Sequence, residues 1–289
     1  MSKIRVFMDN KFSCAEGPLW EKELQRLLFV DSDRTFVYAA SDTELVTMID
    51  DMQVSSIAFA KSGYVLLGDG VCLLGRDGSK QRLLTEHDGE KLFFNDSIVG
   101  PDGRIYAGTY YWGEGGMIKT GKLYRLQNGH EPVVLDDGIE LSNGLAFSPD
   151  HDLLYYSDSA RKCIFCYDFD SVGGTIANKR IFVRSAEGIP DGITTDSEGF
   201  VWCAMWYEGA VYRFDPDGKV ERKYMLPVKQ VSSVAFGGKD MNVLYITSAA
   251  TLFKSPMMPK GLDKKCEMGG KIYCIETDVV GRTEWVAEF

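Results

Sequence analysis

A polar residue recurs at the first position of a short motif that is repeated along the chain. The motif reads polar, small, apolar, small or apolar, then aromatic or similar, and its six copies are "EGPLW", "SSIAF", "NDSIV", "NGLAF", "DGITT" and "SSVAF". Their first residues are Glu16, Ser55, Asn95, Asn143, Asp191 and Ser232. If a repeated fold unit turns all of them toward one centre, two carboxylates and two amides form an oxygen-rich cage. Hard divalent cations prefer oxygen ligands, so the chemistry indicated is cation binding.

The two carboxylates of the set would not sit together easily on their own. Glu16 and Asp191 held close without a cation would repel each other, and one of them would titrate at a raised pKa. The alternative is a water-filled channel that is lined by incidental polar groups.

The spacing of the motif indicates the elements that position it. Successive copies are 39, 40, 48, 48 and 41 residues apart, and each is followed by a turn and a second strand-like run such as "RLLFVDS" or "LLYYSDS". Units of about 40 to 50 residues with three or four short strands are typical of propeller blades. We therefore expect an all-β, six-bladed β-propeller that uses residues 1–289 as a single domain. The early run "IRVFM" would supply a strand to the last blade, so that no open edge remains.

The composition favours a packed β-sheet protein and argues against two classes of binding partner. The chain has 289 residues, 45% of them hydrophobic, with 16 Phe, 14 Tyr and 5 Trp. Acidic residues outnumber basic ones by 42 to 32, and a net charge of -10 argues against a nucleic acid or an anionic membrane as partner. The first residues, "MSKIRVFMDN", lack the apolar stretch of a secretion signal, and no segment is apolar enough to span a membrane. We expect a cytoplasmic protein that is a monomer or a weak homo-oligomer.

The cysteines indicate buried thiols and not a disulfide framework. There are seven, an odd number, and they are scattered through apolar runs. Cys163 and Cys166 have the CxxC spacing of redox or metal sites, but residues three apart in a strand point to opposite faces. We expect two unrelated strand thiols.

An ordered set of longer motifs resembles one known family. "AEGPLW", "FNDS", "GPDGRIYAGT", "SNGLAFSPD", "IPDGITTDSEGFVWCA" and "SSVAFGG" follow one another along nearly the whole chain. This order is similar to that of the senescence marker protein (regucalcin), gluconolactonase and luciferin-regenerating enzyme family. The resemblance implies a six-bladed propeller, in agreement with the repeat count.

The resemblance also implies a metal site on the propeller axis. The Glu of "EGP", the Asn of "SNG" and the Asp of "PDG" bind one divalent metal in that family, and here they are Glu16, Asn143 and Asp191. We expect Ca²⁺, with Zn²⁺, Mg²⁺ and Mn²⁺ as alternatives. Asn95 corresponds to a family Asn that faces metal and substrate. The sequence departs from the family at Phe93, where the family has Arg, and at Ser97, where it has Gly.

The activity implied by the resemblance is metal-dependent hydrolysis of a lactone or a related ester. The metal would polarise the carbonyl oxygen and lower the pKa of a neighbouring water, and Asp191 would be the general base. The alternatives are a non-catalytic metal-binding propeller and an organophosphate hydrolase at the same metal.

Two features bear on the substrate. "TYYWGEGGMIKTG" is a Gly-rich insertion, where Trp112 and Glu114 form either a wall of the substrate site or an ordinary surface loop. The loop "TLFKSPMMPKGLDKK" is either a second wall or, as its length favours, a solvent-exposed connection. Phe93 brings an apolar surface where a guanidinium would grip substrate oxygens, which favours a lactone less polar than a sugar lactone. Alternatively, Phe93 only packs at the rim, and Arg104 or Lys119 replaces the missing guanidinium.

Overall fold

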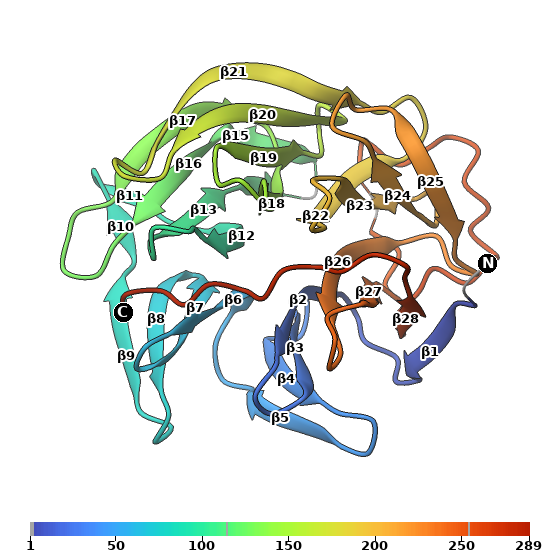
Figure 1. Cartoon of the computed structure of the whole chain (residues 1–289), viewed down its shortest axis with the longest axis horizontal. Helices are drawn as coiled ribbons and strands as arrows, with labels where there is room; N and C mark the ends of the chain where they lie inside the picture. The colour runs from blue at the N-terminus through green and yellow to red at the C-terminus, as the bar shows by residue number, and fades with distance from the viewer. Residues whose placement is uncertain (1–2, 114, 254) are drawn as a thin grey trace.

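The structure, a computed structural model, describes residues 3–113, 115–253 and 255–289. Over these ranges the chain forms strands and turns, without helices. Six four-stranded antiparallel sheets stand around a central axis as the blades of a propeller (Figure 1). The predicted all-β, six-bladed fold is confirmed. No helix that could cross a membrane is found in the described part of the chain.

The first three blades each use four strands that follow one another outward from the axis. Blade 1 contains β2 (Ala15–Glu21), β3 (Arg26–Asp31), β4 (Phe36–Ala40) and β5 (Leu45–Ile49). Blade 2 contains β6 (Val54–Ala60), β7 (Gly63–Gly68), β8 (Gly70–Gly75) and β9 (Lys80–Leu84). Blade 3 contains β12 (Phe94–Val99), β13 (Ile105–Thr109), β16 (Gly121–Leu126) and β17 (Val133–Ile139). The repeated motif lies in the innermost strand of every one of these blades.

The last three blades repeat this plan, and the final one closes the ring. Blade 4 contains β18 (Ser142–Phe147), β19 (Leu153–Asp158), β20 (Cys163–Asp170) and β21 (Thr175–Arg184). Blade 5 contains β22 (Ile189–Thr195), β23 (Val201–Trp206), β24 (Ala210–Phe214) and β25 (Val220–Met225). Blade 6 contains β26 (Val231–Gly237), β27 (Val243–Ser248), β28 (Ile272–Glu276) and, as its outer strand, β1 (Arg5–Met8). The N-terminal strand therefore completes the last blade, as predicted.

Two short hairpins extend from the blades. β10 (Glu86–His87) pairs with β11 (Glu90–Lys91) in the connection between blades 2 and 3. β14 (Tyr111–Gly113) pairs with β15 (Gly116–Lys119) between the second and third strands of blade 3. The second hairpin is the predicted Gly-rich insertion.

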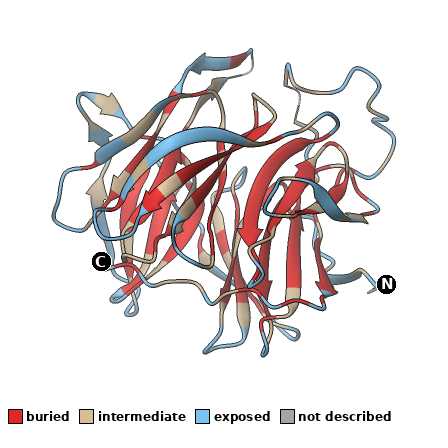
Figure 2. Cartoon of the chain, turned by 45° about the horizontal axis from the view of Figure 1, so that its top comes forward, coloured by how far each residue is buried: buried red, intermediate tan, exposed pale blue. Residues whose placement is uncertain are grey.

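The apolar core is distributed around the ring. Buried side chains gather where neighbouring blades face each other, as in the cluster of Phe147, Tyr156 and Tyr106 between blades 3 and 4. Figure 2 shows the burial concentrated in the inner strands, with exposed residues on outer strands and loops. The second strand of each blade is covered on both faces and is buried along nearly its whole length.

Six of the seven cysteines are buried, as predicted, and Cys266 is partly exposed. All seven are free thiols. Cys163 packs into the cluster between blades 3 and 4, whereas Cys166 packs into the one between blades 4 and 5. The two thiols of the CxxC spacing thus lie on opposite faces of β20.

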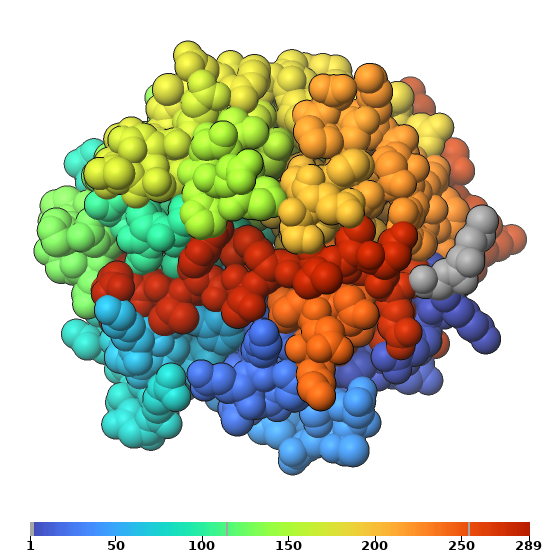
Figure 3. All heavy atoms as spheres, viewed as in Figure 1, coloured from blue at the N-terminus to red at the C-terminus, as the bar shows by residue number. Residues whose placement is uncertain are grey.

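The C-terminal segment crosses one face of the propeller (Figure 3). Backbone hydrogen bonds join Ser197 of blade 5 to Val280 (2.8 Å) and Phe59 of blade 2 to Ala287 (2.8 Å). Because the segment bonds to blades on both sides of the axis, it spans the end of the central channel on that face.

Candidate metal and substrate site

The innermost strands all depart from regular pairing at the motif position. The register between β18 and β19 shifts between Ser142 and Leu145, and that between β22 and β23 shifts between Pro190 and Ile193. The other four inner strands show the same kind of shift at their motif residues. A β-bulge bends a strand and redirects a side chain. The sequence repeat therefore corresponds to a ring of six irregularities around the axis.

The glycines that follow the motif residues allow the inner strands to approach one another closely. A Cβ on Gly144 would lie 2.3 Å from the backbone nitrogen of Ile193, and a Cβ on Gly192 would lie 2.0 Å from Ser233 Oγ. "NG" and "DG", which are ordinary turn signals in sequence, here lie inside strands. Glycine is required because the neighbouring blade occupies the space of a side chain.

Motif side chains also join the blades. Ser55 Oγ donates to Phe94 O (2.7 Å), Asn95 Nδ2 donates to Ser142 O (2.7 Å), and Ser232 Oγ donates to Ala15 O (2.6 Å). Ser55 and Ser232 are buried in these contacts. The expectation that all six motif residues turn toward the axis is therefore wrong for the two serines, whose hydroxyls satisfy backbone carbonyls of the next blade.

Three carboxylates lie close enough at the axis to influence one another. Burial, with the nearby Asp96 charge, raises the pKa of Glu16 from 4.5 to about 8. Burial, with the charges of Glu16 and Asp96, raises the pKa of Asp191 well above its ordinary value. Burial also raises the pKa of Asp96 to about 6. A concentration of negative charge in a poorly solvated place is what a bound cation would relieve.

The oxygen atoms at the axis have few hydrogen-bond donors. Asp191 is 5% exposed, and its buried Oδ1 has no partner among the described residues. Glu16 accepts one bond, from the Gly17 amide at 3.1 Å. Buried polar atoms are normally satisfied, so an orphaned carboxylate oxygen beside a second carboxylate fits a divalent cation. Among the described residues, no group of three or more His, Cys, Asp or Glu lies together in a way that could hold a metal ion.

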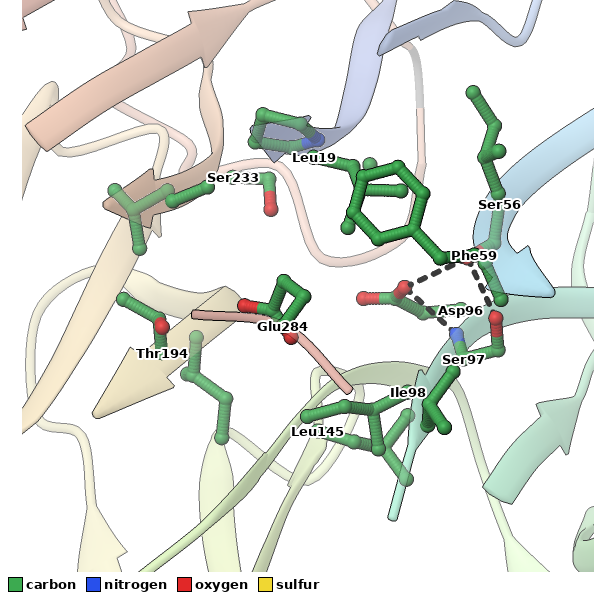
Figure 4. A pocket seen from close by; sticks show the side chains of 18 of the residues that line it. Leu19, Ser56, Phe59, Asp96, Ser97, Ile98, Leu145, Thr194, Ser233 and Glu284 are labelled. Carbon is green, nitrogen blue, oxygen red and sulfur yellow. Dashed lines mark hydrogen bonds between the residues drawn. The ribbon is translucent and has the colours of Figure 1, made fainter. Parts of the chain in front are cut away.

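Asp96 is a residue that the sequence analysis did not single out. It follows Asn95 directly, and strand alternation would turn the two side chains to opposite faces. The register shift between Phe94 and Asp96 breaks this alternation. Figure 4 shows Asp96 facing the channel, where Ser97 N donates to its Oδ1 at 2.7 Å. In the sequence, Asp96 could have been recognised from the pair "ND", which places a carboxylate directly after the motif residue Asn95.

Phe93 and Trp112 lie at the same end of blade 3 as Asn95. Phe93 is 39% exposed, and its ring meets that of Tyr111 edge-on, with 6.2 Å between centroids. Trp112 is partly buried and donates Nε1 to Glu140 O at 2.8 Å, which ties the β14–β15 hairpin to the connection between blades 3 and 4. Glu114 lies outside the described residues.

The two candidate replacements for the missing guanidinium differ in position. Arg104 precedes β13 at the end where Val99 pairs with Ile105, which is the far end of the blade from Phe93 and Asn95. There it bonds to Asp102 at 2.7 Å, so the idea that Arg104 replaces the guanidinium is wrong. Lys119 lies on the hairpin and pairs with Glu90 at 2.9 Å.

The hairpin meets the second candidate wall. A Cβ on Gly116 of β15 would lie 3.0 Å from Pro256 Cγ, in the long loop between β27 and β28. The same loop, apart from Lys254, which is not described, rests on blade 5 through the rings of Phe253 and Trp206, 5.8 Å apart. The hairpin of blade 3 and the loop of blade 6 are thus in contact, although their blades stand opposite each other in the ring.

The channel continues beyond the carboxylates as a cavity toward the C-terminal segment. Its polar lining is Ser56, Asp96, Ser97, Thr194, Ser233 and Glu284. Figure 4 shows Glu284 of the C-terminal segment facing this cavity opposite Asp96. The carboxylates at the axis therefore have the C-terminal segment at one end of the channel and the Phe93 end of blade 3 at the other.

Comparison with known proteins adds evidence independent of this geometry. A family model described as "SMP-30/Gluconolactonase/LRE-like region" matches residues 14–250. Regucalcin of Homo sapiens is 35% identical over 282 residues, which cover 93% of this chain and 92% of regucalcin. The chain belongs to the SMP-30/gluconolactonase/LRE-like family.

Other members of the SMP-30/gluconolactonase/LRE-like family match over the full length. The pentonolactonase XacC of Haloferax volcanii is 28% identical over 291 residues, covering 99% of this chain and 98% of XacC. A solved luciferin-regenerating enzyme superposes with a TM-score of 0.90 at 26% identity and covers 100% of both chains. The resemblance found in the sequence is confirmed, and membership of the family supports a lactone-hydrolysing function.

Proposed function

We propose that the protein hydrolyses a lactone at a divalent cation held by Glu16, Asn143 and Asp191. The observation that carries the proposal is the buried, unpartnered Oδ1 of Asp191, with the charge of Glu16 close by. All the donors are oxygen atoms, so we propose Ca²⁺ as the resident ion, with Mg²⁺, Mn²⁺ and Zn²⁺ as competitors in the test.

The side chains divide the work of hydrolysis. A bound divalent cation would polarise the lactone carbonyl and lower the pKa of an adjacent water. Asp191 accepts a proton from that water while the oxygen of the water attacks the carbonyl carbon. The bond from the carbonyl carbon to the ring oxygen then breaks, and the proton passes to that oxygen, which gives a hydroxy acid.

Asn95 serves as an orienting group in this proposal. Its Nδ2 is held by Ser142 O at 2.7 Å, which fixes the plane of the amide. Its Oδ1 then has a defined direction and can accept a hydrogen bond from a substrate hydroxyl or from the attacking water. A fixed acceptor lowers the entropic cost of reaching the reactive geometry.

The surroundings favour a lactone that is less polar than a sugar lactone. Phe93 exposes an apolar ring beside Tyr111, on the side of the carboxylates that faces away from the C-terminal segment. Trp112 lies on the neighbouring hairpin, and we propose that it forms part of the same wall. Glu114, two residues further along the chain, lies outside the described residues. Apolar walls with few polar groups select for apolar ligand surface.

Metal analysis followed by a substrate panel tests the proposal. Protein stripped with a chelator should lose hydrolysis of alkyl and aryl γ- and δ-lactones, and the addition of Ca²⁺ or another divalent ion should restore it. Turnover by verified metal-free protein would overturn the metal dependence. A folded, metal-binding protein that hydrolyses no lactone, but cleaves organophosphates or nothing, would overturn the lactonase assignment.

A further inference from the structure

Two buried aspartates hold the segments that lead into the strands of Glu16 and Asn143. Asp31, at the end of β3, accepts hydrogen bonds from the amides of Ser13 (2.9 Å) and Cys14 (2.7 Å). Its side chain is fully buried. The two amides lie directly before β2, and Glu16 follows two residues after Cys14.

Blade 4 contains the same arrangement. Asp158, at the end of β19, is fully buried and accepts bonds from the amides of Glu140 (3.1 Å) and Leu141 (3.1 Å). Asn143 follows two residues after Leu141. In both blades one carboxylate therefore grips two successive amides at the same distance along the chain from a proposed ligand.

The register of the sheets shows that this arrangement is restricted to two blades. Asp31 pairs with Ala15, and Asp158 pairs with Ser142, in each case the residue before the proposed ligand. At the equivalent position the other blades have the following residues: Gly68, Thr109, Met205 and Ser248. A carboxylate is thus present only in blades 1 and 4, which supply Glu16 and Asn143.

Ser159, which follows Asp158, links the segment before Asn143 to the strand of Asp191, the third proposed ligand. Ser159 N donates to Leu141 O (3.0 Å), while Ser159 Oγ donates to Pro190 O (2.6 Å), in the residue before Asp191. Ser159 is 2% exposed. Asp158 and Ser159 together fix the backbone on both sides of the contact between β18 and β22.

We infer that Asp31, Asp158 and Ser159 are positioning residues that set the placement of the cation ligands. This inference rests on the cation site of the proposed function, but it does not depend on which substrate is hydrolysed. When two successive amides donate to one buried carboxylate, the leading segment has little freedom to move. Since Glu16 and Asn143 are only two residues further on, a displaced amide moves the ligand atoms.

The competing explanation is that these bonds only stabilise the fold, and Asp196 provides a matched control. It is 1% exposed and accepts hydrogen bonds from the amides of Glu198 (3.0 Å) and Phe200 (3.1 Å). It also accepts bonds from Trp202 Nε1 (2.7 Å) and Arg213 Nε (2.8 Å). It lies between β22 and β23, at the end of β22 remote from Asp191. Asp196→Asn weakens the bonds of a buried carboxylate, including its ion pair with Arg213, without touching the segments before the ligands.

The test measures Mn²⁺ binding to the full chain after metal removal, by calorimetry and by the Mn²⁺ paramagnetic resonance signal, beside the melting temperature of the metal-free protein. Asp31→Asn and Asp158→Asn should weaken Mn²⁺ binding by about tenfold or more, which is the effect of replacing groups that orient metal ligands. Ser159→Ala, a mild change that keeps the fold, should weaken it in the same direction. Asp196→Asn should lower the melting temperature and leave the affinity within about twofold.

The outcomes separate this inference from the proposed function. Unchanged Mn²⁺ affinity in Asp31→Asn, Asp158→Asn and Ser159→Ala would overturn the inference, whatever the melting temperatures. If Asp31→Asn or Asp158→Asn fails to fold, the result for Ser159→Ala decides. Weakened binding without any lactone hydrolysis in the wild type would support the inference and overturn the lactonase assignment. A wild-type protein that binds no divalent ion would overturn both.

Discussion

Asn95 of β12 donates its side-chain amide to the backbone carbonyl of Ser142, the first residue of β18, at 2.7 Å. The bond joins blade 3 to blade 4 directly before Asn143. Ser55 makes the equivalent bond, to Phe94 O at 2.7 Å, between blades 2 and 3. The two bonds are alike, but only the asparagine retains a second polar atom that can meet a substrate.

This pair of bonds defines a comparison of Asn95→Ala with Ser55→Ala. Each change should lower the free energy of unfolding by about 1 to 2 kcal/mol, because a buried carbonyl loses its donor. Asn95→Ala should also lower kcat/KM by about tenfold or more, the equivalent of about 1.4 kcal/mol of transition-state binding. Denaturant titration and steady-state kinetics on a lactone measure the two effects. Equal kcat/KM values for the two variants would show that Asn95 only joins the blades.

The pKa of Glu16 gives the metal-free protein a specific pH dependence. Its folded pKa of about 8 lies above the ordinary value of 4.5, so the folded protein keeps a proton that the unfolded chain releases. Stability of the metal-free protein therefore falls as the pH rises from about 4.5 to about 8 and levels off above that. Asp191, whose pKa is also raised, adds to the fall. A bound cation favours the ionised carboxylates and removes this loss.

Melting temperatures with chelator and with Ca²⁺ should consequently diverge between about pH 5 and about pH 8. Glu16→Gln, which cannot ionise, should flatten the slope of the metal-free curve. A constant difference between the two curves over this range would contradict a cation site at these carboxylates.

The fold could be predicted from the sequence because its signal is repeated. Six copies of one motif, each followed by strand-like runs, are sufficient to fix the number of blades, and "IRVFM" is placed by the need to cover an edge. The free thiols followed from the odd number of cysteines, and the opposite faces of Cys163 and Cys166 followed from strand alternation. These features depend on local pattern, which a single sequence contains.

The site was only partly predictable because it depends on departures from that pattern. The alternation of a strand does not reveal Asp96, since a register shift turns it toward the channel. The shared motif position predicts that Ser55 and Ser232 face the axis, although their hydroxyls bond to the next blade. The buried Asp31 and Asp158 lie in "RLLFVDS" and "LLYYSDS", where they resemble any residue that ends a strand. Their role depends on amides in another segment of the blade.

Gly192 should be intolerant of a side chain. A Cβ there would meet Ser233 Oγ at 2.0 Å, whereas a Cβ on Gly261, in the long loop, would meet nothing within 4 Å. Gly192→Ala should destabilise the fold by about 1 to 3 kcal/mol, as overpacking does, or more if the ring of inner strands opens. Gly261→Ala should leave the unfolding midpoint close to that of the wild type. A neutral Gly192→Ala would contradict the close contact between blades 5 and 6.

Substitution of Asp191 should mainly lower kcat, whereas substitution of Glu16 should mainly weaken metal affinity. Asp191→Asn keeps an oxygen that can ligate a cation but removes the proton acceptor, so kcat should fall by about 10² or more while some metal binding survives. Glu16→Gln should first weaken metal affinity, with kcat partly recovered at high metal concentration. Calorimetric metal titration beside steady-state kinetics separates the two. Normal turnover by Asp191→Asn at saturating metal would require a different base.

Phe93 should set the preference for an apolar lactone. Its ring is 39% exposed at the end of blade 3 where Asn95 lies, and it cannot donate the charge-assisted bonds of an Arg, worth about 1.5 to 3 kcal/mol each. The wild type should therefore have a higher kcat/KM for alkyl or aryl γ- and δ-lactones than for gluconolactone-type sugars, and Phe93→Arg should shift the ratio toward the sugars by about tenfold or more. Phe93→Leu, which keeps an apolar surface, is the control and should retain the wild-type preference. A wild-type preference for the sugar lactone that Phe93→Arg leaves unchanged would show that another residue, such as Lys119, selects the substrate.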